Sequence, residues 1–184
     1  MVVSDINEGG GRETVRLISE QGGSAAFFRA DVGVERDVGA VITFSEENYG
    51  GVDILVNNAG PYFHAVPLEK WFETIQANLM GTAYGTLRGI EAMRKRGGGA
   101  FVNFSSTSAI GHDFKPSSSP AYDAAKAGIT RLTTMLAWLQ KGTDSRELYR
   151  PRLGCDRRTA DVRGFADPAT MPRTRRSTAS HNPG

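Results

Sequence analysis

Two residues with the chemistry of an acid–base pair stand four positions apart. Tyr122 and Lys126 lie in a stretch with helical spacing, so their side chains share one face of that helix. A phenol has a pKa of about 10, and a neighbouring ammonium group favours the phenolate and lowers that pKa. The pair fits a general acid or base tuned toward neutral pH, although a solvated pair on a helix surface has the same spacing.

Further polar residues stand near this pair in the sequence. Ser105 and Ser106 directly follow an apolar stretch, and a hydroxyl at that point can hydrogen-bond a substrate carbonyl or alcohol oxygen. A serine-rich turn accounts for the same two residues. Asn78 falls inside a helical stretch, where asparagine is usually a tolerated surface residue.

The tetrapeptide Asn57-Asn58-Ala59-Gly60 follows another short apolar run. Open α/β sheets bind ligands at the carboxyl ends of their strands, and small residues there let a cofactor approach the backbone. An ordinary asparagine-rich turn is the alternative interpretation.

These residues need a scaffold, and the hydrophobic pattern up to about residue 141 predicts one. Strands are expected at residues 2–5, 25–28, 53–57 and 100–104, and helices at 9–21, 35–48, 67–95 and 120–139. The run at 53–57 is apolar almost throughout, as in a strand buried inside a parallel sheet. Repeated β-α-β units predict an α/β fold, a Rossmann-like doubly wound parallel sheet with helices on both faces.

Composition narrows the class of protein. The 184 residues suit one domain, and no apolar run reaches the roughly 18 residues of a membrane span. The N-terminus has no secretory pattern, so the expected location is cytoplasmic. The single cysteine, Cys155, excludes a disulfide within the chain, and no metal site is expected.

In chain order, these motifs resemble the short-chain dehydrogenase/reductase family, from Met1 to about Leu139. The resemblance rests on the Asn-Asn-Ala-Gly turn, an Asn-Leu-x-Gly stretch at 78–81, a Val-Asn-x-Ser-Ser strand end at 102–106, and Tyr-x-x-x-Lys followed by Ala-Gly. It implies an NAD(P)-dependent oxidoreductase that transfers hydride between nicotinamide and a small-molecule alcohol or ketone. Its intact members are commonly homo-oligomers.

The resemblance also implies roles for the catalytic candidates. Tyr122 would be the general acid/base, and Lys126 would lower its pKa and hold the nicotinamide ribose. Ser106 would position the substrate oxygen, and Asn78 would hold a water molecule in the proton relay.

The cofactor-binding candidates follow in the same way. Asn57, Ala59 and Gly60 would line the cofactor cleft, and Asp31-Val32 matches an adenine-contacting position. Asp5 stands at the end of the second strand of such a fold, where a carboxylate accepts hydrogen bonds from the adenosine ribose and repels a 2′-phosphate. The expected cofactor is therefore NAD rather than NADP, although Asp5 also suits a helix-entry cap.

The sequence departs from the family pattern at both of its ends. The family opens with a strand and a Gly-rich turn that holds the pyrophosphate, and the sequence starts near the end of the second strand. We expect one β-α unit to be absent from this sequence. The strands at 2–5 and 25–28 then have no partner joining them to the rest of the sheet, and the exposed strand edges predict low stability.

The segment 142–184 breaks the pattern and carries nine Arg and no Lys. Its composition predicts disorder beyond a partial Rossmann-type domain at residues 1–141. Shifted by one base, the codons of Asp144–Pro151 can be written to encode Ile-Arg-Val-Asn-Cys-Ile-Ala-Pro, which resembles the strand that follows the tyrosine helix in the family. We hypothesise a frameshift near residue 142, with loss of the C-terminal strand.

Three functions are compatible with the sequence. The first is the dehydrogenase, whose activity in this chain we doubt because the phosphate-binding turn is absent. The second is a non-catalytic remnant, such as a pseudogene product or a gene-model artefact. A nucleic-acid binder acting through the Arg-rich segment is the third, and it is disfavoured because the segment lacks amphipathic order and interleaved aromatic residues.

Overall fold

The chain alternates between strands and helices in the order that the sequence predicts. The computed structural model describes residues 1–63, 67–110, 119–141 and 152–154. Its elements are β1 (Val2–Asp5), α1 (Glu8–Glu20), β2 (Ala26–Arg29), α2 (Glu35–Tyr49), β3 (Ile54–Asn57), α3 (Leu68–Ile75), the π-helical turn η1 (Gln76–Met80), α4 (Gly81–Lys95), β4 (Ala100–Phe104), the 3₁₀ turn η2 (Thr107–Ala109), α5 (Pro120–Lys141) and β5 (Arg152–Gly154).

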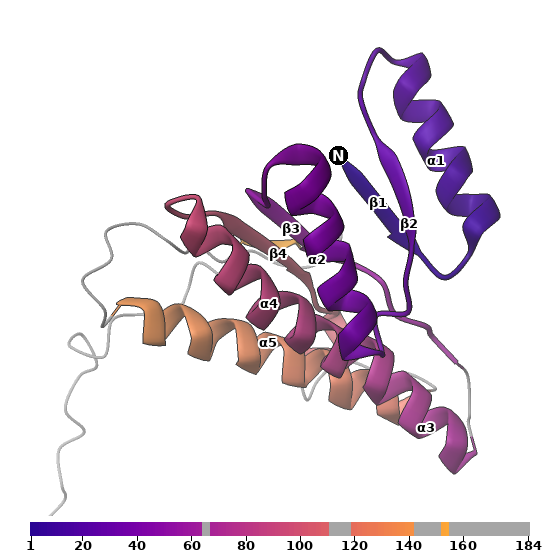
Figure 1. Ribbon diagram of the computed structural model, residues 1–184. Coiled ribbons are helices and arrows are strands. Elements are labelled where there is room, and N and C mark those ends of the chain that lie inside the picture. Colours follow the sequence, from indigo (N-terminus) through magenta and orange to yellow (C-terminus); the bar gives the residue numbers. More distant parts are fainter. Residues whose placement is uncertain (64–66, 111–118, 142–151, 155–184) are drawn as a thin grey trace, which may run out of the picture.

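The strands form two separate parallel sheets. β1 pairs with β2, and β3, β4 and β5 form a second sheet in that order. Figure 1 shows β1, β2 and α1 standing apart from the block made by β3, β4, α4 and α5, with α2 between them. The prediction of an incomplete doubly wound sheet, with the two N-terminal strands unconnected to the rest, is confirmed.

The first sheet has a helix on each face. Phe27 and Phe28 are neighbours on β2, so their side chains point to opposite faces. The Arg12 guanidinium of α1 lies 5.7 Å from the centroid of the Phe27 ring. The ring of Phe28 lies 5.1 Å from that of Phe44 on α2. α1 and α2 therefore cover opposite faces of this sheet.

The second sheet is covered on one face within the described part of the chain. Phe101 of β4 is 2% exposed and packs in the main apolar core with Ile42, Val52, Ala92 and Met93. On β3, by contrast, Ile54 is 67% exposed and Val56 is 52% exposed. The expectation of a strand buried on both faces is wrong for β3, because its other face and its edge toward β1 meet no described element.

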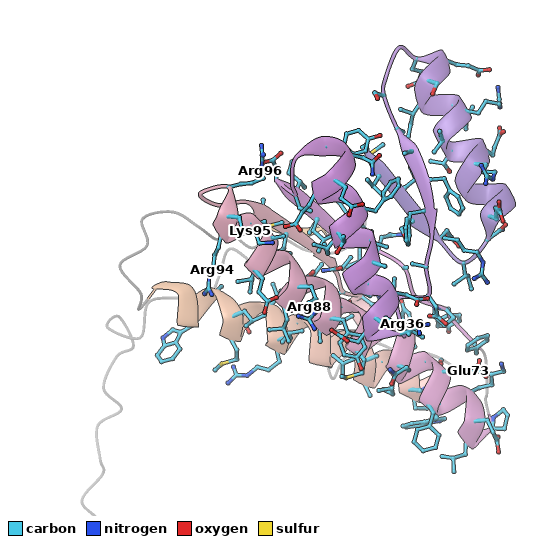
Figure 2. All side chains as sticks on the ribbon, in the orientation of Figure 1. Arg36, Glu73, Arg88, Arg94, Lys95 and Arg96 are labelled. Carbon is cyan, nitrogen blue, oxygen red and sulfur yellow. The ribbon has the colours of Figure 1, made fainter. Side chains whose placement is uncertain are left out.

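Ion pairs hold α2 against α4 and its C-terminal turn. Arg88 donates to Glu35 (Nε to Oε1, 2.7 Å), and Lys95 donates to Glu46 at 2.8 Å. Figure 2 shows Arg88, Lys95 and Arg96 along this side of the molecule. Arg88, Glu35 and Lys95 are exposed and Glu46 is half-buried, so each pair contributes at most about 1 kcal/mol. The apolar core beneath them, centred on Ile42, is the stronger link between the two helices.

The helix expected at 67–95 is continuous, but it changes from α-helical to π-helical and back to α-helical geometry. α3 passes into η1, and η1 passes into α4 without a break. A π-helical turn inserts an extra residue and locally reorients the side chains, and such turns are frequent at functional sites. This turn contains Asn78.

The segment beyond α5 holds one element that the sequence did not predict. Residues Arg152–Gly154 form β5, which pairs in parallel with β4 from Val102 to Phe104. The disorder predicted for 142–184 therefore does not extend to these three residues, and residues 142–151 and 155–184 lie outside the described residues. An unpaired edge of β4 accepts any extended backbone, because the pairing uses main-chain groups alone. The proposed frameshift at 144–151 lies outside the described residues.

Candidate active site

The sequence candidates meet where the parallel strands end. β3 and β4 run in register from Ile54 opposite Ala100 to Asn57 opposite Asn103, so both strands end at the same edge of the sheet. Ser105 and Ser106 follow β4 at this edge, and α5 packs against β4. The arrangement brings together residues that are more than sixty positions apart in the chain.

Tyr122 and Ser106 are in contact. Their side chains form a hydrogen bond, and this bond acts to lower the pKa of Tyr122. Burial has the larger effect and raises that pKa above its ordinary value, and the nearby Tyr62 and Asp123 raise it further. Tyr122 is therefore a protonated phenol at neutral pH in this structure.

Lys126 lies one turn further along α5 and is 5% exposed. Its ammonium nitrogen is 5.3 Å from the centroid of the Tyr122 ring and donates to the backbone oxygen of Phe104 at 2.9 Å. Burial lowers the pKa of Lys126. Burial of the phenol outweighs the hydrogen bond with Ser106, so the Tyr122 pKa is raised in this structure, and its lowering by Lys126 stays a prediction.

The two adjacent serines have different partners. The Ser105 hydroxyl donates to the backbone oxygen of Lys126 at 3.1 Å and lies 2.6 Å from the Thr130 hydroxyl, which ties the end of β4 to α5. The Ser106 hydroxyl accepts hydrogen bonds from the backbone and side chain of Ser108, at 3.3 and 3.0 Å. Ser106, the serine singled out from the sequence, is thus the one that reaches Tyr122.

Asn78 is fully buried, contrary to what its helical position alone predicts. Its side-chain nitrogen donates to the backbone oxygens of Pro61 at 2.9 Å and Thr74 at 3.0 Å. Its side-chain oxygen has no hydrogen-bond partner within the described ranges. A Cβ at Gly60 would overlap this oxygen, so a glycine is needed where the turn after β3 crosses η1.

Asn57 belongs to a buried polar network. Its side-chain nitrogen donates to Asn103 Oδ1 at 2.8 Å and to the Thr86 hydroxyl at 3.2 Å. Asn103 in turn donates to the Thr133 hydroxyl at 3.0 Å. The network joins β3, β4, α4 and α5. The Asn57 amide is therefore committed to holding the strand ends in register, although the residue also lines the cavity between the two sheets.

The remaining cofactor candidates lie at the ends of the first sheet. Asp5 ends β1 and is exposed, and one of its oxygens accepts the backbone N–H of Asn7 at 2.8 Å. Asn7 itself caps α1, so Asp5 is not the helix cap. Asp31 accepts the backbone N–H of Gly33 at 2.8 Å in a turn after β2.

A cavity of about 770 Å³ separates β1 from β3. Asp5, Val32, Asn57 and Ala59 all line it. No group of three or more His, Cys, Asp or Glu in the described part of the chain is arranged to hold a metal ion. None of the described helices is long and apolar enough to cross a membrane.

Several residues of the site were not singled out from the sequence. Asn103, Thr86 and Thr133 are buried polar residues that form the network, and Tyr62 packs edge-on against Tyr122 with 4.9 Å between ring centroids. Asn103 lies two positions from Phe101 in β4, so both side chains point to the same face of the sheet, which is the signal that could have marked Asn103 as inward-facing. The loop expected on the substrate side, at 111–116, lies outside the described residues.

A Rossmann-like sheet whose strand ends carry a hydrogen-bonded serine and tyrosine beside a buried lysine is typical of one class of oxidoreductase. A family model for short chain dehydrogenases matches residues 1–143. The chain belongs to this family.

Named relatives agree with this assignment. An uncharacterized oxidoreductase of Thermotoga maritima is 37% identical over 141 residues, which cover 74% of this chain and 54% of the relative. A 3beta-hydroxysteroid dehydrogenase 1 of Eggerthella lenta is 39% identical over 137 residues, covering 71% of this chain and 51% of the relative. The chain thus spans about half the length of the curated relatives that it matches.

Solved structures show the same fold. A short chain dehydrogenase/reductase from Burkholderia phymatum in complex with NAD has a TM-score of 0.75 at 26% identity, covering 84% of this chain and 55% of that chain. A gluconate 5-dehydrogenase from Burkholderia cenocepacia in complex with NADP and tartrate has a TM-score of 0.68 at 26% identity, covering 76% of this chain and 55% of that chain.

Proposed function

We propose that the site built on Tyr122, Ser106 and Lys126 is that of a nicotinamide-dependent oxidoreductase, which transfers hydride between NAD and an alcohol or carbonyl group of a small molecule. The hydrogen bond between Ser106 and Tyr122 carries the proposal, because it joins two hydroxyls that can address a single substrate oxygen. The Ser108 hydroxyl donates a hydrogen bond to the Ser106 hydroxyl, and this bond orients the Ser106 side chain toward the substrate oxygen.

The protonation states favour proton donation. Burial keeps the Tyr122 phenol protonated at neutral pH, so Tyr122 donates a proton to a carbonyl oxygen that is becoming an alcohol. Ser106 hydrogen-bonds the same oxygen and orients it. Lys126 places a positive charge 5.3 Å from the phenol ring, which stabilises the phenolate left behind. When bound, the nicotinamide supplies or accepts the hydride.

Two other residues complete the proposed proton path and cofactor site. The unpartnered Asn78 side-chain oxygen is an acceptor suited to a water molecule. Lys126 has three N–H donors and uses one on Phe104, which leaves donors for a ribose hydroxyl.

The residues present fit the two ends of a dinucleotide. The exposed carboxylate of Asp5 suits the adenosine ribose and opposes a 2′-phosphate, which favours NAD over NADP. Ala59 and Gly60 leave the backbone open beside the cleft, and Asp31 and Val32 are proposed to contact the adenine.

The pyrophosphate has no comparable site among the described residues. Gly9, Gly10 and Gly11 lie inside α1, whose first turn is capped by Asn7 and carries the acidic Glu8. The N–H groups of Gly10 and Gly11 are used by the helix and its cap, and the neighbouring carboxylate repels phosphate. We therefore expect weak cofactor binding by this chain, with a dissociation constant of about 1 mM or more.

A non-catalytic remnant of such an enzyme is the second candidate, and the divided sheet favours it. The partners of the oxidoreductase would be small molecules and further copies of the chain, and its location cytoplasmic. We propose no partner among nucleic acids or membranes.

The test combines cofactor binding and turnover. NADH binding is followed by the fluorescence of Trp71 and Trp138, and turnover by absorbance at the nicotinamide band with a panel of alcohols and ketones. Turnover that Tyr122→Phe abolishes, and that Tyr84→Phe leaves unchanged, supports the oxidoreductase. Turnover that survives Tyr122→Phe contradicts the assigned role. Absence of both binding and turnover at about 20 mM cofactor, well above the expected dissociation constant, identifies the remnant.

A further inference from the structure

Tyr62 follows the turn after β3, and a buried residue fixes the backbone of this turn. Asn78, fully buried in η1, donates to the backbone oxygen of Pro61 at 2.9 Å. A Cβ at Gly60 would overlap the Asn78 side chain, so the turn packs closely on η1. The two residues before Tyr62 are therefore held against η1, and the Tyr62 side chain starts from a defined position.

The adjacent aromatic residues Tyr62 and Phe63 have different partners. The Phe63 ring lies with its centroid 5.0 Å from the ammonium nitrogen of Lys70 on α3. The centroid of the Tyr62 ring lies 4.9 Å from that of Tyr122, at an interplanar angle of 84°. Edge-on aromatic pairs at this distance are favourable. Phe63 therefore packs toward α3, and Tyr62 belongs to the site on α5.

The Tyr122 ring contacts two other side chains of the site. Lys126 places its ammonium nitrogen over this ring, and Tyr62 meets the ring edge-on. The hydroxyl of Tyr122 forms its hydrogen bond with Ser106. Tyr122 thus offers a substrate its hydroxyl, and the aromatic surface beside that hydroxyl is supplied by Tyr62, which is 43% exposed.

A group attached to a substrate carbonyl can reach the Tyr62 ring. This step rests on the proposed function, in which Tyr122 hydrogen-bonds the substrate oxygen. Such a bond is about 2.7 Å long and a carbonyl bond about 1.2 Å, so the carbonyl carbon lies within about 4 Å of the Tyr122 hydroxyl oxygen. A ring on that carbon then lies at the distance where aromatic rings interact, with centroids about 4.5–7 Å apart.

A flat substituent suits this position better than a puckered one. Stacked or edge-on aromatic pairs gain about two- to tenfold in binding beyond their buried area, because the negative face of one ring meets the positive edge of the other. A saturated ring has no such charge pattern. We propose that Tyr62 is a specificity-determining residue, whose ring selects substrates that carry an aryl group on the carbonyl or carbinol carbon.

Two ketones that differ mainly in planarity test the proposal with the full chain. Acetophenone carries a phenyl ring on its carbonyl carbon, and cyclohexyl methyl ketone carries a saturated ring in the same place. Ligand-observed nuclear magnetic resonance titration without cofactor gives both dissociation constants, so the readout does not need turnover. We expect acetophenone to bind with a dissociation constant of about 10 mM or lower. Its binding should be about two- to tenfold tighter than that of the saturated ketone.

Two variants of Tyr62 separate the ring from the rest of the side chain. Tyr62→Leu keeps an apolar side chain without a ring, so the preference for acetophenone should fall below about 1.5-fold, and Tyr62→Phe should retain it. Tyr84→Leu is the matched control, because Tyr84 is a half-buried tyrosine whose hydroxyl accepts from Gln76 at 3.4 Å, and it should keep the preference. The ratio of the two constants cancels a general loss of folded protein, and circular dichroism checks the helices.

Tyr122→Phe locates the bound carbonyl. It should weaken the binding of both ketones about two- to tenfold and leave their ratio unchanged, because both lose the same hydrogen bond. Binding that Tyr122→Phe leaves unchanged places the ketones elsewhere and overturns the proposal.

The supporting result is a preference for acetophenone that Tyr62→Leu removes and that Tyr62→Phe and Tyr84→Leu retain. Equal binding of the two ketones, a preference that survives Tyr62→Leu, or no acetophenone binding up to about 20 mM overturns the proposal. A preference that depends on the Tyr62 ring, without turnover by NADH, supports the aryl site and counts against the oxidoreductase. Turnover without that preference overturns the role of Tyr62 alone.

Discussion

Replacement of Asn103 by alanine should destabilise the fold strongly, because this side chain is the centre of the buried network. It is 1% exposed, accepts from Asn57 and donates to Thr133. Both partners keep another bond: Asn57 still donates to Thr86, and Thr133 still donates to the backbone of Ile129. Two buried hydrogen bonds contribute about 1 kcal/mol each, and the space left by the amide costs about 1 kcal/mol more. The expected loss in the free energy of unfolding is about 3 kcal/mol.

The assay is equilibrium unfolding in urea, followed by far-ultraviolet circular dichroism. Asn48→Ala is the matched control, because Asn48 is an exposed asparagine whose side chain donates to the backbone of Phe44 at 2.9 Å. Its cost should stay below about 0.5 kcal/mol. A double-mutant cycle of Asn103→Ala with Thr133→Val should give a coupling energy of about 1 kcal/mol. If Asn103→Ala is no more destabilising than Asn48→Ala, the network does not hold the strand ends, and the reasoning fails.

Three further outcomes follow from the site and its supports. Ser106→Ala should raise the pKa of Tyr122 further, since the lost hydrogen bond acts to lower it, and ultraviolet titration of the phenolate against Tyr122→Phe measures the shift. The pKa of Tyr122 in the folded state is raised above the ordinary value of 10.0, so the free energy of unfolding should be retained below pH 10 and fall as the pH rises through the folded pKa. Tyr122→Phe should remove this loss of stability. Urea unfolding midpoints at several pH values measure it. Gly85→Ala should lower the free energy of unfolding by about 1–3 kcal/mol, because a Cβ there would overlap the Asn57 side chain. Arg88→Ala breaks only exposed ion pairs and should lower it by less than about 1 kcal/mol. The reverse order of the two variants in thermal unfolding would contradict both assignments.

The order and type of the elements could be read from the sequence because they depend on local patterns. The helix at 120–139 and the strand at 100–104 have strong periodicity and appear as α5 and β4. The pairing of Tyr122 with Lys126 on one helix face is likewise local, since four positions make about one turn. Ser106 could be placed near them because parallel strands end at a common edge.

The burial of individual residues could not be read in the same way. Asn78 is a surface residue by helix pattern, but the π-helical turn η1 directs it inward, where Pro61 and Thr74 accept its hydrogen bonds. Ile54 and Val56 are core residues by composition, yet both are exposed. In each case the outcome depends on which distant segment lies alongside, and a local pattern holds no information about that.

The sequence alone determined the family and the alternation of strands and helices, and it predicted that Ser106, Tyr122 and Lys126 lie together, because each rests on residue types at short spacing. It also determined that the sheet would divide, since the strand order of the fold leaves β1 and β3 without a shared neighbour. Only the tertiary structure decided that Ser105 binds α5 while Ser106 reaches Tyr122, and that burial outweighs the Ser106 hydrogen bond and raises the Tyr122 pKa. Hydrogen bonds and desolvation act over a few ångströms in space, and the distances that set them exist only once the chain has packed.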